Sequence, residues 1–405
     1  MLVFYLFAAI AIWLGLLSLR GGLHFLAYVQ REIALPISDY APFVSVIAPF
    51  REIDEGLKEN LAALFNQRYP AYEIVFVTGC AEDPALNIVE EVRAAMSGPH
   101  SEITSRVIIA GDAADSGQKV HNLRVAVTEL KQRAEVIVFV DTDARPHENW
   151  LRSLVAPLSD ESVGAATGYR WFVPTKIGAA SSLRSVWNAS IASALGQARD
   201  KNFCWGGSTA IRRSTFDRLN VVERWRGTVS DDFTLTRVLH DAQLPIYFSP
   251  HCLIASFDDC SFPELLEFTT RQLKITRVYA THLWRAVLLG GLLFVPVFFG
   301  GIALVMARAM LAWSIVLPVV LLSIIFVLGA AKSWFRLRAV SLALAHYSSP
   351  LRQGVLAHLL LWPIASALFL YNSLAAACSR RINWRGIRYE LKSPSEAVII
   401  ARDTD

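Results

Sequence analysis

The sequence predicts an α/β domain with a mostly parallel sheet and helices on both faces, combined with transmembrane α-helices. The first observation is that apolar strand-like runs alternate with amphipathic helical patterns between residues 43 and 140. Such alternation is typical of parallel sheets covered by helices. The second observation is composition, since 54% of the 405 residues are hydrophobic and 18% are charged. So apolar a chain of this length is not an ordinary soluble protein.

The first apolar segment covers residues 2–19 and carries no charge, and Arg20 and Arg31 follow it. A cleaved signal peptide would have positive residues before its apolar core and a small-residue cleavage site after it, and neither is evident. We therefore expect residues 1–20 to form an uncleaved membrane anchor. Because Arg20 and Arg31 belong on the cytosolic side, the domain that follows is expected in the cytosol.

That domain is expected over residues 40–270 and is long enough to bury a full α/β core. Its first part contains four apolar runs separated by patterns with a helical period. The strands are predicted at residues 43–48, 72–77, 106–110 and 136–140, with helices at 55–66, 85–96 and 119–130. The last run is rich in β-branched residues, which favours a buried parallel strand.

Two carboxylates, Asp141 and Asp143, follow the fourth strand one residue apart. Ligands of open α/β sheets bind at the carboxyl ends of the strands. Two hard oxygen ligands suit a divalent cation, Mg²⁺ or Mn²⁺, that bridges phosphates. An isolated Asp-x-Asp is also compatible with a solvated turn after a strand, so the surrounding residues must decide.

Polar residues also follow the other three strands. Glu52 follows the first, Asp83 the second, and Lys119 and Asn122 the third. Asp83 is placed to accept hydrogen bonds from a base or a ribose. Lys119 opens a helix, so its ammonium and the helix amino end could both face a diphosphate. Each group alone fits ordinary loop chemistry, but groups at four consecutive strand ends favour a nucleotide site.

Two further groups lie beyond the fourth strand. Gly206 and Gly207 let the backbone approach a ligand closely, and Trp205 suits the face of a sugar. Asp231 and Asp232 stand directly before a predicted amphipathic helix. Capping is the usual role of aspartate there, but two in succession exceed what capping requires. The alternative is a general base that takes a proton from an acceptor hydroxyl.

Three more apolar stretches, at residues 286–307, 309–331 and 355–378, make up the region 286–378, which we expect to hold the carboxyl-terminal transmembrane helices. Each exceeds the roughly 20 residues that span a bilayer core. Only Arg308 separates the first two, which predicts a hairpin. The basic and aromatic residues 271–285 run directly into it as an interfacial segment.

The third stretch raises a conflict. A single crossing would place the positive residues of the tail, 379–405, outside, against the positive-inside tendency. A re-entrant segment at Pro363 and an interfacial helix at residues 339–347 are the alternatives that remain open. The net charge of +4 surrounds the membrane edges, as headgroup neighbours would, so nucleic acid is not expected as a partner. Five scattered cysteines indicate neither a disulfide framework nor a zinc site.

Together these residues resemble a known family, the family 2 inverting glycosyltransferases with a GT-A nucleotide-sugar-binding domain. Ceramide glucosyltransferases and their bacterial relatives are the most similar subgroup. The resemblance rests on the order Asp83, Asp141-Thr-Asp143, Trp205-Gly-Gly, Ser230-Asp-Asp232, Arg271-Gln-Leu-Lys274 and the closing pattern Ile382-Asn-Trp384-Arg-Gly-Ile-Arg388-Tyr389. It covers nearly the whole chain and includes the anchor and the membrane hairpin.

The resemblance implies roles for these residues. Asp83 would contact uridine, Asp141 and Asp143 would hold the metal and the diphosphate, and Asp232 would be the general base. The substrate contacts would also include Arg271, Gln272 and Lys274, which would brace the leaving diphosphate at the membrane surface. The family pattern places Arg-Trp where Lys274 and Ile275 stand here. Lysine loses the bidentate fork of arginine, and the missing tryptophan favours one transfer to a lipid over chain extension.

We therefore expect a membrane enzyme that moves a hexose, with glucose as the first candidate, from a UDP-sugar donor to a lipid acceptor such as ceramide. A processive polysaccharide synthase and a non-catalytic membrane protein that binds nucleotide or lipid are the alternatives. The catalytic domain is expected in the cytosol, and the compact loops favour a bacterial inner membrane over a Golgi or ER membrane.

Overall fold

A computed structural model describes residues 2–96, 103–176 and 178–402. The chain forms two compact units, each built from separate pieces of the sequence. Unit 1 contains Met1–Arg31, Phe172–Ser193 and Asp258–Ser379. Unit 2 contains Glu32–Trp171, Ala194–Phe257 and Arg380–Asp405. The region 40–270 that was expected as one domain therefore contributes residues to both units.

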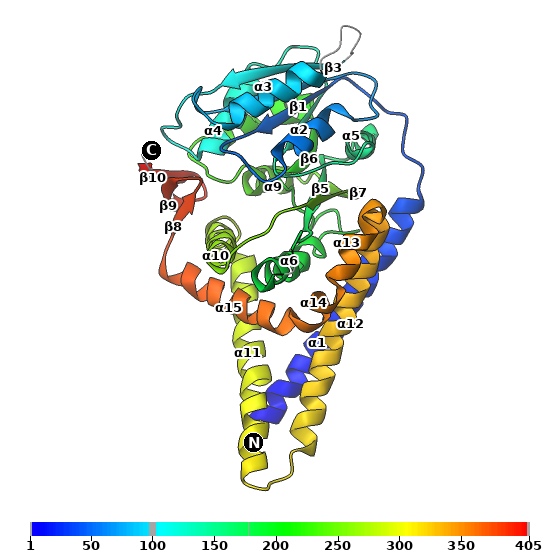
Figure 1. Ribbon diagram of the computed structural model, residues 1–405, viewed down its shortest axis with the longest axis vertical. Helices are drawn as coiled ribbons and strands as arrows, with labels where there is room; N and C mark the ends of the chain where they lie inside the picture. Colours follow the sequence, from blue (N-terminus) through cyan, green and yellow to red (C-terminus); the bar gives the residue numbers. More distant parts are fainter. Residues whose placement is uncertain (1, 97–102, 177, 403–405) are drawn as a thin grey trace. The chain divides into compact units, whose positions relative to one another are not determined.

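A seven-stranded sheet with the order β3-β2-β1-β4-β6-β5-β7 organises unit 2 (Figure 1). Its first four strands pair in parallel, β1 with β2 and β4, and β2 with β3, whereas β6 is antiparallel to both β4 and β5. This confirms the predicted mostly parallel sheet. The strands are β1 (Val44–Pro49), β2 (Tyr72–Thr78), β3 (Ile103–Ile109), β4 (Val136–Val140), β5 (Ala165–Phe172), β6 (Ser208–Arg212) and β7 (Ile246–Ser256).

Helices cover both faces of this sheet, as predicted. They include α2 (Leu57–Phe65), α3 (Ala85–Met96) and α4 (Gln118–Thr128). Val75 and Val77 of β2 join a buried core with residues of α4. Phe76 lies between them in sequence and so faces the other side, where its ring centroid is 6.1 Å from that of Phe65 on α2. Burial on both faces explains why these strands read as continuous apolar runs.

Unit 1 is helical and contains the three helices that are long and apolar enough to cross a membrane, judged by length and composition. They are α1 (Leu2–Ala34), α11 (Thr281–Met310) and α12 (Val316–Ala343). Two shorter helices, α6 (Ala179–Ala192) and α10 (Phe262–Tyr279), precede the hairpin of α11 and α12. The ring of Trp187 on α6 stacks on Phe369 with centroids 4.6 Å apart.

The third carboxyl-terminal stretch is broken. It forms α14 (Val355–Leu360) and α15 (Trp362–Cys378), and α15 has 17 residues, fewer than the roughly 20 that a spanning helix needs. The tail that follows forms a three-stranded sheet of β8 (Arg381–Trp384), β9 (Ile387–Ser393) and β10 (Glu396–Arg402).

This tail sheet belongs to unit 2. The hydroxyl of Tyr389 accepts a hydrogen bond from the backbone N–H of Gln118 at 3.1 Å, and Arg402 donates to the carbonyl of Ala113 at 2.6 Å. The tail and the seven-stranded sheet therefore lie on one side of any membrane that the chain spans. Of the open alternatives, this favours a stretch that re-enters or lies along the interface, and it removes the conflict with the positive-inside tendency.

A labelling experiment tests this topology. In sealed vesicles, a membrane-impermeant maleimide should react with the exposed Cys80 of unit 2 and with a Lys392→Cys variant from the same side. A Ser314→Cys variant, in the loop between α11 and α12, should react only from the opposite side. Reaction of positions 80 and 392 from opposite sides would contradict the shared location.

Candidate active site

Lys119 lies at the centre of a group of charged side chains in unit 2. Its Nζ is 2.7 Å from Oδ1 of Asp141, at the end of β4, and 3.4 Å from Oδ1 of Asp231, at the start of α9 (Asp231–Asp241). Gly117, directly before α4, brings the two segments together, since a Cβ there would lie 3.0 Å from Cα of Val229. The expected convergence of carboxylates 90 positions apart in the sequence is therefore observed.

A second cation, Arg170, binds the Asp-x-Asp pair from β5. Its guanidinium donates to both oxygens of Asp143, at 2.9 and 3.0 Å, and to Oδ2 of Asp141 at 3.2 Å. It also lies over the ring of Trp205, 5.0 Å from the centroid. We call Lys119, Asp141, Asp143, Arg170 and Asp231 the strand-end cluster.

The charges of the strand-end cluster hold one another ionised. Burial alone would raise the pKa of Asp141, but Lys119 and Arg170 lower it below its ordinary value. Burial would likewise lower the pKa of Lys119 and of Arg170, but the carboxylates around them raise both. Neighbouring opposite charges thus outweigh desolvation. The cluster supplies two fixed cations and at least one fixed carboxylate at the carboxyl ends of the central strands.

Asp231 is the exception, because burial raises its pKa to about 6. The neighbouring charges of Asp232 and Asp141 raise it as well, and Lys119 opposes them. A carboxyl group that titrates near neutral pH and touches a fixed ammonium is typical of active sites.

We expect this titration to appear in the pH profile of turnover. Below pH of about 6, protonation of Asp231 removes one of the two carboxylates that hold Lys119, so kcat/KM should fall as the pH is lowered through that value. Profiles from pH 5 to 8 for the wild type and for Asp231→Asn provide the check. The acidic limb should be absent from the variant at whatever rate it retains, and an unchanged limb would assign it to another group.

Asp232 faces a different environment. Its Oδ1 accepts hydrogen bonds from its neighbour Phe233 N, at 2.7 Å, and from the hydroxyl of Ser230. Ser230 also caps α9 by accepting from Phe233 N at 3.2 Å. The capping role considered for the two aspartates therefore falls on Ser230 and on one oxygen of Asp232. The side chain of Asp232 is partly exposed, and within the described residues these hydrogen bonds use Oδ1 alone.

The segment Trp205-Gly-Gly lies against the strand-end cluster. A Cβ at Gly206 would collide with the carboxylate of Asp231 and lie 2.9 Å from Nζ of Lys119, so only glycine fits between them without a shift. Gly207 lies against the ring of Trp205. Trp205 itself is 8% exposed, and one side of its ring meets Arg170. Its predicted contact with a sugar stays a prediction.

The residues predicted after the first two strands meet each other. Asp83 accepts from the backbone N–H of Glu52 at 3.1 Å, from that of Ala85 at 3.0 Å and from the hydroxyl of Thr78 at 3.0 Å. Asp83 therefore fixes the loops after β1 and β2, whatever ligand it also contacts.

Asn122 supports the third strand end through a neighbour. Its Oδ1 accepts from Nε2 of Gln118 at 2.9 Å, and the same Nε2 donates to the carbonyl of Gly111 at 2.8 Å. Oε1 of Gln118 accepts from Ala113 N at 3.0 Å. The loop between β3 and α4 is thus held in place by Gln118.

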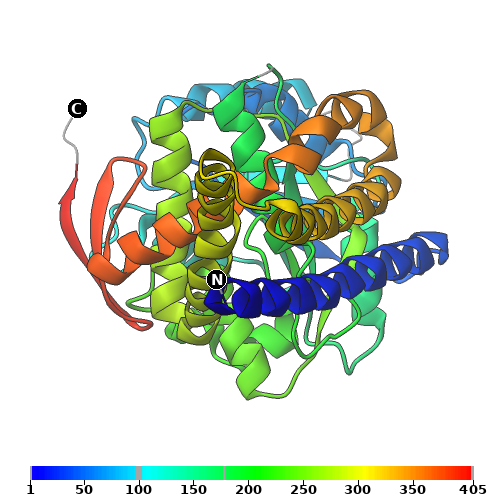
Figure 2. The ribbon, with the colours of Figure 1, turned by 90° about the horizontal axis from the view of Figure 1, so that it is seen from below.

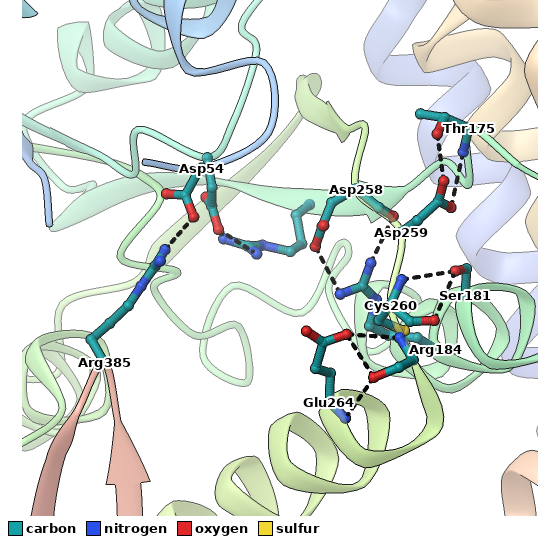
Figure 3. Close-up of polar contacts among 12 residues, drawn as sticks. Asp54, Thr175, Ser181, Arg184, Asp258, Asp259, Cys260, Glu264 and Arg385 are labelled. Atoms are coloured by element: carbon teal, nitrogen blue, oxygen red, sulfur yellow. Dashed lines mark hydrogen bonds and ion pairs between the residues drawn. The ribbon is translucent and has the colours of Figure 1, made fainter. Parts of the chain in front are cut away.

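Arg385 reaches the same region from the tail. It stands in the turn between β8 and β9, where it and Gly386 both have positive φ, 51° and 68°, as tight hairpin turns require. Its guanidinium lies 2.5 Å from Oδ1 of Asp54 and 3.5 Å from Oε2 of Glu52 (Figure 3). Burial would lower the pKa of Arg385, but Asp54 raises it, and so do Asp143 and Glu52.

The remaining predicted residues, Arg271, Gln272 and Lys274, lie on α10 in unit 1. The segment before α10 is fixed to α6, since Arg184 pairs with Asp258 at 2.7 Å and Cys260 N donates to Ser181 at 2.9 Å (Figure 3). Their contact with the diphosphate stays a prediction.

The family model of Glycosyl transferase family 21 matches residues 3–397. The chain belongs to Glycosyl transferase family 21. Among curated relatives, Ceramide glucosyltransferase 3 of Caenorhabditis elegans is 19% identical over 394 residues, which cover 91% of this chain and 79% of that protein. Hyaluronan synthase of Streptococcus pyogenes is 30% identical over 126 residues, 31% of this chain and 28% of the relative.

Among solved structures, the mannosyltransferase PcManGT from Pyrobaculum calidifontis, in complex with GDP-Man and Mn²⁺, has a TM-score of 0.49 and 19% identity. The match covers 92% of this chain and 98% of that one. The family assignment confirms the predicted kinship with ceramide glucosyltransferases. This family 21 chain is a glycosyltransferase with three candidate membrane spans.

The family 21 chain presents two carboxylates that suit a divalent cation. Among the described residues, no group of three or more histidine, cysteine, aspartate or glutamate side chains is placed to hold a metal. Mg²⁺, however, is usually held by one or two carboxylates together with substrate phosphates. Asp141 and Asp143 provide such hard oxygen donors, and Asp143, with a side chain 33% exposed, is the more accessible of the two. The pair therefore fits a cation shared with a diphosphate.

Two residues of this site were missed by the sequence interpretation. Arg170 is a single charge inside the otherwise apolar run Ala165–Phe172, and a buried arginine requires a partner, which was the available signal. Arg385 belongs to the closing pattern of the tail, but only the packing of the tail sheet in unit 2 brings it to Asp54 and Glu52.

Proposed function

We propose that this family 21 glycosyltransferase transfers a hexose, with glucose as the first candidate, from a UDP-sugar to the hydroxyl of a lipid such as ceramide. The observation that carries the proposal is the convergence of Asp141 and Asp231 on Lys119, with Asp232 next in sequence at the amino end of α9. It assembles groups for diphosphate binding and for proton transfer in one unit.

The donor diphosphate would bind to fixed positive charge. Lys119 and Arg170 are cations in the strand-end cluster, and Lys119 stands in the first turn of α4, whose amino end also favours phosphate. Arg385 would add a third cation from the tail turn, exchanging its contact with Asp54 for a phosphate oxygen. Asp83, next to these loops, would contact the uridine.

A divalent cation held by Asp141 and Asp143 would neutralise charge on the diphosphate as it leaves. The chain's own part in that step is to hold both carboxylates ionised. The cations of the strand-end cluster do so by keeping the pKa of Asp141 below its ordinary value.

Asp232 would act as the general base. In one displacement, the acceptor oxygen bonds to the anomeric carbon, the bond from that carbon to the diphosphate oxygen breaks, and the hydroxyl proton passes to Asp232. UDP leaves and the configuration inverts. Asp232 suits this step better than Asp231, because Asp231 is buried against Lys119 whereas Asp232 is partly exposed and keeps Oδ2 outside its hydrogen bonds to α9.

A lipid acceptor is supported by the three candidate spans and by the full-length likeness to a ceramide glucosyltransferase. We propose an integral membrane protein with unit 2 in the cytosol, in a bacterial inner membrane rather than the Golgi or ER. The second candidate, a polysaccharide synthase, is favoured by the match of 126 residues to hyaluronan synthase. Against it stand the few candidate spans and the Lys274-Ile275 pair in place of Arg-Trp.

The test uses the full chain in lipid nanodiscs with Mg²⁺ or Mn²⁺, UDP-glucose, UDP-galactose or UDP-N-acetylglucosamine, and ceramide, diacylglycerol or a sterol. Mass spectrometry should find lipid carrying one hexose, with UDP released in equal amount. Long sugar chains would establish the synthase instead. If no donor yields a glycolipid and no UDP is released, the catalytic proposal is wrong and a binding role gains support.

A further inference from the structure

Two basic side chains on α12 are covered by unit 1 without an acidic partner. Arg336 is 3% exposed and Lys332 lies one turn before it. Within the described residues neither forms an ion pair. Lys332 Nζ donates to the hydroxyl of Ser18 at 2.7 Å, and Arg336 Nη2 donates to that of Ser333 at 3.2 Å. Nε of Arg336 is buried and has no hydrogen-bond partner.

Such burial differs from the usual behaviour of basic residues near the ends of membrane helices. Lysine and arginine there normally extend their charged groups outward to the lipid headgroups. Arg338, two residues further on, does face outward and is exposed. Arg336 instead turns into the protein, where a charge without a partner is strongly unfavourable. Charged groups inside membrane segments are for this reason usually part of a binding site or pathway.

The surrounding helices cannot supply a counter-ion from their own sequence. Residues 1–31 and residues 281–378 contain no aspartate or glutamate. The nearest other titratable group, His358 on α14, is 2% exposed and bonds to the hydroxyl of Ser185 at 3.2 Å. It carries no negative charge in any protonation state. The negative charge that balances Lys332 and Arg336 must therefore come from a ligand.

Lys332 lies where α12 meets α1. The two helices run side by side (Figures 1 and 2), and a Cβ at Gly22 of α1 would lie 3.2 Å from Cγ of Lys332. Both helices are candidate membrane spans. An anion that reaches this position between two spans must be attached to an apolar tail, because a free ion would have to leave water for hydrocarbon.

We propose that Lys332 and Arg336 bind the phosphate group of an anionic membrane phospholipid. Phosphate oxygens accept charge-assisted hydrogen bonds from both an ammonium and a guanidinium, and they would satisfy the free Nε of Arg336. This site is independent of the proposed sugar transfer, since all of its residues belong to unit 1 and none belongs to the strand-end cluster.

Native mass spectrometry of the full chain, released from detergent with added lipid, tests the proposal. Phosphatidylglycerol should be retained about tenfold better than phosphatidylcholine of the same acyl chains, as expected for one or two charge-assisted contacts. Inorganic phosphate at millimolar concentration should not displace it. Equal retention of the two lipids, or displacement by inorganic phosphate, would overturn the assignment to an anionic lipid.

Matched variants locate the site. Arg336→Met and Lys332→Met should each lose the preference for phosphatidylglycerol, whereas Arg338→Met removes the same charge from the exposed face and should keep it. The apparent Tm gives a second reading, because phosphatidylglycerol should raise it for the wild type and Arg338→Met but not for Arg336→Met. If Arg336→Met does not fold, Lys332→Met and the charge-keeping Arg336→Lys decide. Equal preference in Lys332→Met and Arg338→Met would refute the site.

Discussion

Replacement of Asp232 by asparagine should reduce kcat by a factor of about 10² to 10⁴, the usual contribution of a general base. An asparagine side chain cannot take the proton of an acceptor hydroxyl. It can still accept the hydrogen bonds from Phe233 N and Ser230 through its carbonyl oxygen, so α9 should keep its capped start. UDP binding should survive, because Lys119, Asp141 and Arg170 are unchanged.

Turnover measured by glycolipid formation, and UDP affinity measured by calorimetry, separate the two effects. Asp241→Asn is the matched control, because Asp241 is the exposed last residue of the same helix and its loss should leave both quantities unchanged. Wild-type turnover in Asp232→Asn would eliminate Asp232 as the base. Loss of UDP binding together with turnover would show that Asp232 holds the donor instead.

Replacement of Lys119 by methionine should destabilise unit 2 by about 3–5 kcal/mol, the usual cost of removing one partner from a buried ion pair. Lys119 contacts both Asp141 and Asp231, and all three side chains are at most 21% exposed. Methionine keeps the apolar stem but leaves the two carboxylates with less positive charge. Donor binding should also weaken, since the ammonium at the start of α4 is lost.

The effect of Lys119→Met on stability should depend on pH, with a sign that follows from Asp231. Its pKa is about 6 in the folded chain and ~3.9 in an unfolded one. The folded chain therefore binds more protons between these values, and stability falls as the pH rises through that window. Lys119 lowers the pKa of Asp231, so its removal extends the window upward and the loss should be larger at pH 8 than at pH 5.

Apparent Tm values at the two pH values provide the measurement. Lys131→Met is the matched control, because Lys131 is exposed shortly after the end of the same helix and exposed charges contribute little. An Lys119→Met variant as stable as the control at both pH values would show that the ion pairs around Lys119 do not stabilise the fold.

The two cations that face the Asp-x-Asp pair differ in where the chain supplies them. Lys119 comes from the helix after β3, as the nucleotide-site interpretation expected. Arg170 comes from β5, beyond the part of the sheet that the alternating pattern predicted. It occupies both oxygens of Asp143, so donor binding through Asp143 requires Arg170 to share or release that carboxylate. Its contact with Trp205 would then link donor binding to the Trp205-Gly-Gly segment.

The sequence by itself determined the parts of this protein that local pattern encodes. The runs Val136–Val140 and Tyr72–Thr78 are apolar throughout, so burial on both faces could be inferred before their partners were known. The parallel sheet, the Asp-x-Asp pair at its carboxyl edge and the three apolar spans followed from period and composition. The family motifs added the role of Asp232, which stays a prediction.

Only the tertiary structure decided which distant charges meet. Strand order brings Arg170 from β5 beside Asp143, and the packing of the tail sheet in unit 2 brings Arg385 to Asp54. The side of the tail was decided in the same way, since its charges alone posed a conflict. The physical reason is that local patterns report whether a side chain is buried and with what period. The partner of a buried charge depends on loops that return the chain from far away, and no short segment records where they lead.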